Sequence, residues 1–185
     1  ETELTITKME HYWDEGFGYL QGLDNQFVPG LADGGDRAHL NYYLNKVNSQ
    51  GNEDGITKKI YDAFTLGRAA IVAKDYDERD KQAAIVAAEI SKVVGYKAFY
   101  YIEKGSGYIS EGKWAAAHHA LSEAYGFILG MQFTKAADGE PYMTNGEVNT
   151  MLDALAAGNG FWDRTPAELD DMAVQLKAAT GLSSP

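Results

Sequence analysis

The chain has 185 residues, a formal net charge of −11 and no cysteine. Its negative charge disfavours nucleic acid and anionic membranes as partners, because like charges repel, and it favours cations and basic proteins. The absence of cysteine excludes disulfide bonds, thiolate catalysis and cysteine-based zinc sites, and the 45% share of hydrophobic residues is ordinary for a soluble globular protein.

Helical signals dominate the sequence and predict an all-α fold, a helical bundle. The first helix is expected at about residues 11–22. Residues 24–55 are predicted to be a long irregular insertion, rich in glycine, asparagine and aspartate, with a short helix at 36–47. An insertion of this length inside a compact domain is often functional.

Four more helices are predicted from apolar residues that recur with a period near 3.6, at 55–76, 77–105, 110–133 and 145–157. Thr165, Pro166 and Glu168 together predict a capping box that starts a last helix. Evidence for a strand is limited to residues 3–7. We therefore expect residues 1–185 to form a single helical domain.

No segment has the character of a membrane span. The most apolar stretch, residues 83–102, contains Glu89, Lys92 and Lys97, and a membrane-spanning helix rarely carries three charges. The chain begins at Glu1 rather than methionine, and no basic and apolar leader precedes it. We therefore expect a processed form, or the C-terminal part of a longer precursor.

One short pattern occurs twice, as HYWDEGFGYLQG at 11–22 and as HALSEAYGFILG at 119–130. At this constant offset four pairs are identical, namely His11 and His119, Glu15 and Glu123, Gly18 and Gly126, and Gly22 and Gly130. We call this pattern, His-x-x-x-Glu-x-x-Gly-x-x-x-Gly, the repeated motif. It predicts two pseudo-symmetric halves, each with one such helix.

Helical geometry places the four residues of each copy on one narrow stripe, within about 60° of one another. Glycines on that stripe would let another backbone approach closely, although each glycine costs about 1 kcal/mol of helix propensity relative to alanine. The histidine and the glutamate would then be partly buried, and a buried charge requires a partner.

Three interpretations supply such partners. In the first, each histidine pairs with the glutamate of its own copy in a structural hydrogen bond. In the second, the imidazoles and carboxylates of both copies bind one iron, zinc or manganese ion; the ligands would be His11, Glu15, His119 and Glu123. In the third, the same four residues line a polar cleft for an organic ligand. If the two helices cross at their glycines, the pairs form two separate half-sites instead of one site.

Other residues carry weaker signals. Asp14 lies about 60° off the stripe and is either an acceptor that orients His11 or a solvated acid. His118 lies about 100° from His119 and is expected to face elsewhere. The sequence has no nucleophile elbow, no His-Glu-x-x-His metalloprotease motif and no phosphate-binding glycine loop. An enzyme is therefore not supported by a motif.

Three blocks carry a family resemblance: HYWDEGFGYL, GRAAIVAKDY and AAAHHALSEAYGFILGMQF. They resemble an uncharacterised bacterial lipoprotein family that is similar to the imelysins. The resemblance implies an all-helical fold of two bundle-like halves, an exported location in the periplasm or at the outer membrane, and a link to the uptake of iron or another metal. The chain departs from the imelysin hallmark Gly-x-His-x-x-Glu, because each glutamate follows one residue later and the glycine position two residues before each histidine is occupied by Met9 or Ala117. We therefore assign no catalytic role to any residue of this chain on the basis of the resemblance.

Our leading hypothesis is an exported, non-catalytic protein that binds a metal ion or a small ligand at the His/Glu stripe, with a cell-envelope protein as a further partner. The alternative is a structural or protein-interaction module, in which the His/Glu pairs are buried hydrogen bonds. A metal-dependent enzyme would additionally need an open coordination position.

Overall fold

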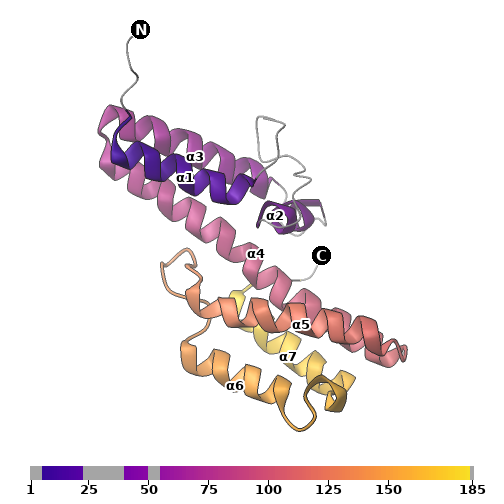
Figure 1. Cartoon of the computed structure of the whole chain (residues 1–185). Helices are drawn as coiled ribbons and strands as arrows, with labels where there is room; N and C mark the ends of the chain where they lie inside the picture. Colours follow the sequence, from indigo (N-terminus) through magenta and orange to yellow (C-terminus); the bar gives the residue numbers. More distant parts are fainter. Residues whose placement is uncertain (1–5, 23–39, 50–54, 184–185) are drawn as a thin grey trace. The chain divides into compact units, whose positions relative to one another are not determined.

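The computed structural model describes residues 6–22, 40–49 and 55–183 (Figure 1). Within these ranges the chain forms seven α-helices and two short 3₁₀-helices, and no strand. The prediction of an all-α fold is confirmed.

The chain divides into two compact units, unit 1 up to Ile90 and unit 2 from Ser91. Unit 1 contains α1 (Lys8–Gln21), α2 (Leu40–Ser49), α3 (Ile56–Ala73) and the first part of α4 (Tyr76–Ser110). Unit 2 contains the rest of α4, then α5 (Trp114–Gly130), η1 (Met131–Phe133), α6 (Asn145–Ala156), η2 (Gly160–Asp163) and α7 (Pro166–Thr180). Each unit therefore contains one copy of the repeated motif, in α1 and in α5.

The predicted helices are all present, but some of their ends differ. Helix α2 is the short helix expected inside the 24–55 insertion, and most of the rest of that insertion lies outside the described residues. Helix α4 continues to Ser110 instead of ending at Gly105. Gly105 is buried, and a Cβ there would lie 2.5 Å from Leu121 Cδ2, so this glycine serves helix packing and not helix termination.

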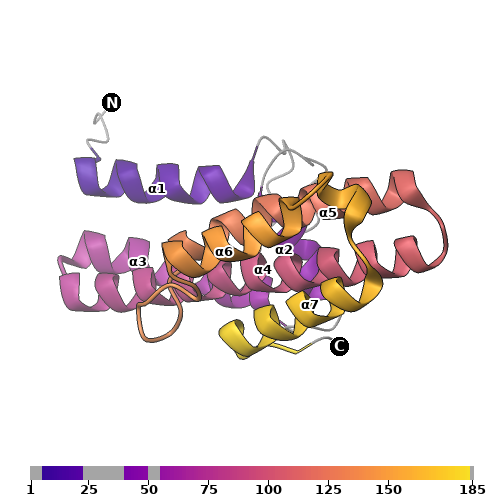
Figure 2. The same ribbon diagram turned by 90° about the horizontal axis from the view of Figure 1, so that it is seen from below.

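In unit 1, α1, α2 and α3 pack against one another. Figures 1 and 2 show α1 running along α3. The buried hydrophobic side chains of this unit are aliphatic, and they come from all of its helices: Leu20, Leu44, Val47, Ile56, Ile60, Ala63, Ala70, Ile71 and Val86. Their burial removes apolar surface from water, which is the main force that holds the helices together.

In unit 2, α5 packs on α6 and α7 is attached to the second part of α4 (Figure 2). Ser106 of α4 donates a hydrogen bond to Asp170 of α7 at 2.7 Å, and Lys177 of α7 forms an ion pair with Glu103. The aromatic pair Tyr96 and Phe99 of α4 is buried. Among the described helices, none is long and apolar enough to cross a membrane, in agreement with the prediction.

Three helices begin with the same Thr-x-x-Glu capping box. The pairs are Thr7 and Glu10 at α1, Thr144 and Glu147 at α6, and Thr165 and Glu168 at α7. In each pair the threonine hydroxyl accepts a hydrogen bond from the glutamate N–H, and the glutamate carboxylate accepts one from the threonine N–H. These bonds satisfy backbone donors that a helix start leaves free. The box at Thr165 confirms the prediction.

The capping boxes make stability dependent on pH. Hydrogen bonds from the threonines lower the pKa of Glu147 and of Glu168 below the ordinary value of 4.5. A carboxyl whose pKa is lowered by folding stabilises the fold above its unfolded pKa, and this contribution is lost as the pH falls through the lower, folded pKa.

We expect Glu147→Gln to lower the melting temperature at pH 7 and to make it less sensitive to acid. Glutamine still accepts the hydrogen bond but cannot titrate, so the loss of stability below about pH 4.5 becomes smaller. Thermal unfolding followed by circular dichroism between pH 3 and pH 7 measures this. The control is Glu140→Gln, an exposed glutamate outside the capping boxes. Parallel curves for the wild type and Glu147→Gln would contradict the prediction.

Candidate functional site

The repeated motif lies on exposed sides of its two helices. His11, Glu15, Gly18, His119 and Gly126 are exposed, and Glu123 is half-buried. A Cβ at Gly18 or Gly126 would meet no atom within 4 Å. The expectation of a close-packed glycine stripe is therefore wrong. Each helix packs instead through the apolar residues on its other side, whose burial removes apolar surface from water.

The last glycine of the motif also differs between the two copies. Gly22 ends α1 with a φ of 79°, a conformation that glycine adopts without strain. Gly130 has a φ of −68° and continues directly into η1. The same residue is thus a helix stop in one copy and an ordinary helical position in the other.

The histidine and the glutamate of the first copy do not pair with each other. Among the described residues, no hydrogen bond or ion pair joins His11 to Glu15. The first interpretation, a bond within each copy, is therefore not observed in α1 and stays a prediction for α5. In the residues that the structure describes, no three histidine or carboxylate side chains are grouped as a metal site requires. A shared site would take two ligands from each unit, and it stays a prediction.

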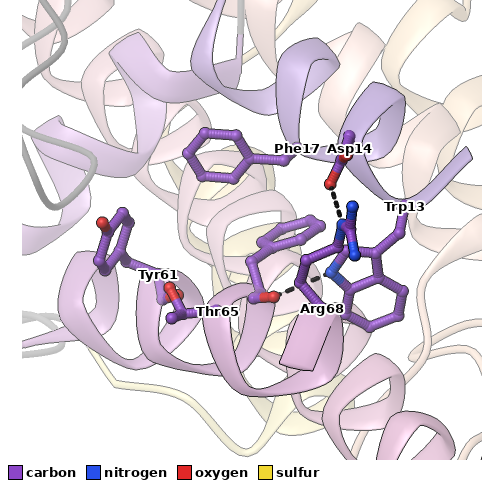
Figure 3. A pocket seen from close by; sticks show the side chains of 7 residues that line it. Trp13, Asp14, Phe17, Tyr61, Thr65 and Arg68 are labelled. Atoms are coloured by element: carbon purple, nitrogen blue, oxygen red, sulfur yellow. Dashed lines mark hydrogen bonds and ion pairs between the residues drawn. The ribbon is translucent and has the colours of Figure 1, made fainter. Parts of the chain in front are cut away.

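A cleft of about 320 Å³ lies in unit 1 between α1 and α3 (Figure 3). Helix α1 contributes Trp13, Asp14 and Phe17, and α3 contributes Tyr61, Phe64, Thr65 and Arg68. Figure 3 shows the side chains of Asp14 and Phe17 directed from α1 towards α3. We call this feature the aromatic cleft.

Four aromatic rings form the walls of this cleft, and they meet edge to face. The ring centroids of Phe17 and Phe64 are 5.3 Å apart, those of Trp13 and Phe64 are 5.7 Å apart, and those of Phe17 and Tyr61 are 6.2 Å apart. Edge-to-face contacts at such distances are favourable because the positive edge of one ring meets the negative face of another. The four rings therefore brace one another and hold the walls in place.

Trp13 is fixed by a close approach to the backbone of α3. Its indole N–H donates a hydrogen bond to the carbonyl of Phe64 at 2.9 Å. A Cβ on residue 67 would lie 2.1 Å from Trp13 Cζ2, so only a glycine at this position leaves room for the indole. Gly67 thus has the packing role that we expected for the glycines of the repeated motif.

Charged groups gather at one end of the cleft, around Arg68. Its Nη1 donates to Glu10 Oε1 and its Nε donates to Asp14 Oδ1, both at 2.8 Å. The hydrogen bond to Asp14 is the main cause of the raised pKa of Arg68. The pKa of Glu10 is lowered, first by the backbone N–H of Thr7 and then by its hydroxyl, with Arg68 as a further cause. Asp14 is therefore an exposed acid that pairs with Arg68 of α3, and not the acceptor that orients His11.

Sequence reasoning missed the aromatic cleft, although part of its signal was visible. Trp13 and Phe17 are four residues apart, as are Phe64 and Arg68, and each pair shares one side of its helix. What the spacing did not show is that the side of α1 with Trp13 and Phe17 faces α3, 51 residues further along the chain at Phe64.

Unit 2 contains two other hollows, and both are less suited to a ligand. A groove of about 790 Å³ between α6 and α7 is lined by Met143, Met151 and Met172, and its one charged side chain, Glu147, is part of a capping box. A surface hollow of about 380 Å³ is lined by Ser122, Glu123, Gly126 and Phe127 of α5. A binding site generally combines apolar walls with a few convergent polar groups, and of these three hollows the aromatic cleft meets this description best.

Replacing Gly67 by alanine should destabilise the protein by about 1–3 kcal/mol, because the new methyl group displaces the indole of Trp13. Gly18→Ala is the matched control, since this glycine is also helical but has open space around it. We expect Gly18→Ala to stabilise the protein by up to about 1 kcal/mol, through better helix propensity. Urea-induced unfolding followed by circular dichroism measures both. If Gly18→Ala were the more destabilising change, the close-packed stripe would be correct after all.

Comparison with known proteins adds one finding. No curated protein and no solved structure matches the chain significantly. A family model described as a domain of unknown function, DUF4856, matches residues 1–183. Because the match covers nearly the whole length of both units, the chain belongs to the DUF4856 family.

Proposed function

We propose that this protein is a binding protein and that the aromatic cleft of unit 1 holds a small organic ligand. The observation that carries the proposal is the combination of four mutually braced aromatic rings with a charged group at one end of the same cleft. Apolar walls supply affinity by excluding water, and a few polar groups fix the orientation of the ligand. The volume of about 320 Å³ suits a small molecule.

The polar residues of the cleft favour binding over catalysis. The Thr65 hydroxyl donates a hydrogen bond to the Tyr61 carbonyl at 2.9 Å, so this donor is used by the backbone of its own helix, α3. Asp14 holds Arg68 in a charge-assisted hydrogen bond, which occupies one oxygen of its carboxylate. A general base or nucleophile would need a pKa or a geometry suited to proton transfer with a substrate. The pair is better suited to holding the end of the cleft in a fixed shape.

An exported location is part of this proposal. It rests on the resemblance to a bacterial lipoprotein family similar to the imelysins, which are exported helical proteins. A cell-envelope protein would be a further partner in that setting. The chain's net charge of −11 is compatible with a ligand that is neutral or positively charged.

The neutral fluorescent probe N-phenyl-1-naphthylamine should bind the protein with a saturable rise in fluorescence. We expect Thr65→Trp to weaken this binding at least about tenfold, because an indole at this exposed lining position fills the cleft. Leu66→Trp is the matched control, since Leu66 is the next residue of α3, is also exposed and does not line the cleft. Its affinity for the probe should equal that of the wild type.

Two results would overturn the proposal. One is the absence of saturable binding to the wild-type protein. The other is an equal loss of affinity in Thr65→Trp and Leu66→Trp, which would place the probe elsewhere on the protein.

Metal binding by the repeated motif is a second candidate function. The observation in its favour is that His11 and Glu15 are both exposed, four residues apart on one helix and not bonded to each other, so both are accessible to an ion. The same spacing recurs at His119 and Glu123.

Elemental analysis of protein purified without chelator or metal-affinity resin tests this candidate, with zinc and iron added in a second sample. If the four residues share one ion, His11→Ala and His119→Ala should each abolish near-stoichiometric binding. If they form two half-sites, each substitution should halve it. A control variant, His118→Ala, should have no effect. Wild-type protein that stays free of metal after incubation would exclude the candidate.

A further inference from the structure

The charged end of the aromatic cleft carries more negative than positive charge. Glu10 and Asp14 both contact the guanidinium of Arg68, so two carboxylates surround one cation. The side chain of Glu10 is 14% exposed and that of Arg68 is 27% exposed, which places this group partly out of water. Partial burial strengthens electrostatic interactions, because the surroundings screen charge less than bulk water does.

Arg68 is poorly placed to bind an anionic ligand. Its Nε and Nη1 are both engaged by carboxylates at 2.8 Å. An incoming anion would have to displace one of these charge-assisted bonds, and it would then lie beside a second negative charge. The guanidinium of Arg68 therefore serves to hold Glu10 and Asp14 in place, and not to bind an anionic ligand.

Asp14 is the group at this end that can contact a ligand. It lines the cleft and its side chain is 50% exposed. Its Oδ1 accepts the bond from Arg68, while its Oδ2 accepts no hydrogen bond within the described part of the chain. Figure 3 shows this carboxylate beside Arg68, at the same side of the cleft as Trp13. A donor on the ligand could reach Oδ2 without breaking the ion pair.

The aromatic walls of the cleft favour a positively charged ligand, as the Asp14 carboxylate does. The faces of Trp13, Phe17, Tyr61 and Phe64 carry the negative part of the ring quadrupole, and they attract cations. The chain as a whole has a net charge of −11, which raises the local concentration of cations at its surface.

We propose that the ligand of the aromatic cleft is an organic cation, with a flat apolar body between the aromatic walls and a protonated amine that donates a hydrogen bond to Asp14 Oδ2. This inference rests on the proposed function, that the cleft binds a small ligand. It adds the charge and the chemical class of that ligand.

Three ligands of matched shape test the charge: 2-naphthylmethylamine, which is protonated at pH 7, the neutral 2-naphthylmethanol, and the anionic 2-naphthoate. Each competes with N-phenyl-1-naphthylamine for the wild-type protein. We expect the amine to bind at least about fivefold more tightly than the alcohol, and the acid to bind at least about fivefold more weakly than the alcohol. This comparison needs no variant.

Asp14→Asn locates the effect. It should reduce the preference for the amine over the alcohol to less than about twofold, because the amide of asparagine carries no charge. Asp62→Asn is the matched control, because Asp62 is an exposed acid of α3 that pairs with Lys58 and does not line the cleft. It changes the net charge of the protein by the same amount and should keep the full preference.

The outcomes separate the inference from the proposed function. Equal affinity for amine and alcohol, or tightest binding of the acid, would contradict the proposal that the ligand is a cation. Either result would still leave the cleft as a binding site. Loss of the preference in both Asp14→Asn and Asp62→Asn would also overturn the inference, since the overall charge would then be responsible. If neither the probe nor any of the three ligands binds, the proposed function fails and the inference fails with it.

Discussion

Unit 1 depends on one close contact, in which the indole of Trp13 lies on the bare backbone of α3 at Gly67. The contact sets the distance and the register between α1 and α3. Phe17, one helical turn after Trp13, then meets Phe64, and Asp14 meets Arg68. The aromatic walls and the charged end of the cleft are thus both consequences of a position without a side chain.

Unit 2 uses the same device on a different helix. Gly105 of α4 lies under Leu121 of α5, and Gly95 lies beside Thr180 at the end of α7. In both units the glycines that matter for packing are those that face a side chain of another helix. Gly18 and Gly126, which recur in the repeated motif, face open space. Repetition in the sequence and close packing in the structure therefore single out different glycines.

Much of the fold could be predicted from the sequence, because helix periodicity and capping chemistry are local. The last helix was identified from Thr165, Pro166 and Glu168 alone, and Thr7 and Thr144 carry the same signal. The candidate site could be predicted only in part. The repeat drew attention to α1, but the side of α1 that packs is decided by residues such as Arg68, which lies 54 positions after its partner Asp14. Local spacing contains no information about that partner.

Helix α4 has 35 residues, so it is about 50 Å long, and the boundary between the two units falls between two of its residues, Ile90 and Ser91. Proteases cleave best where the backbone is exposed and free to extend, and a continuous helix offers no such segment. Cutting the chain at this boundary would also create two new helix ends, each with four backbone groups that lack a partner. The two units are therefore poor candidates for separate expression, even though each has its own core.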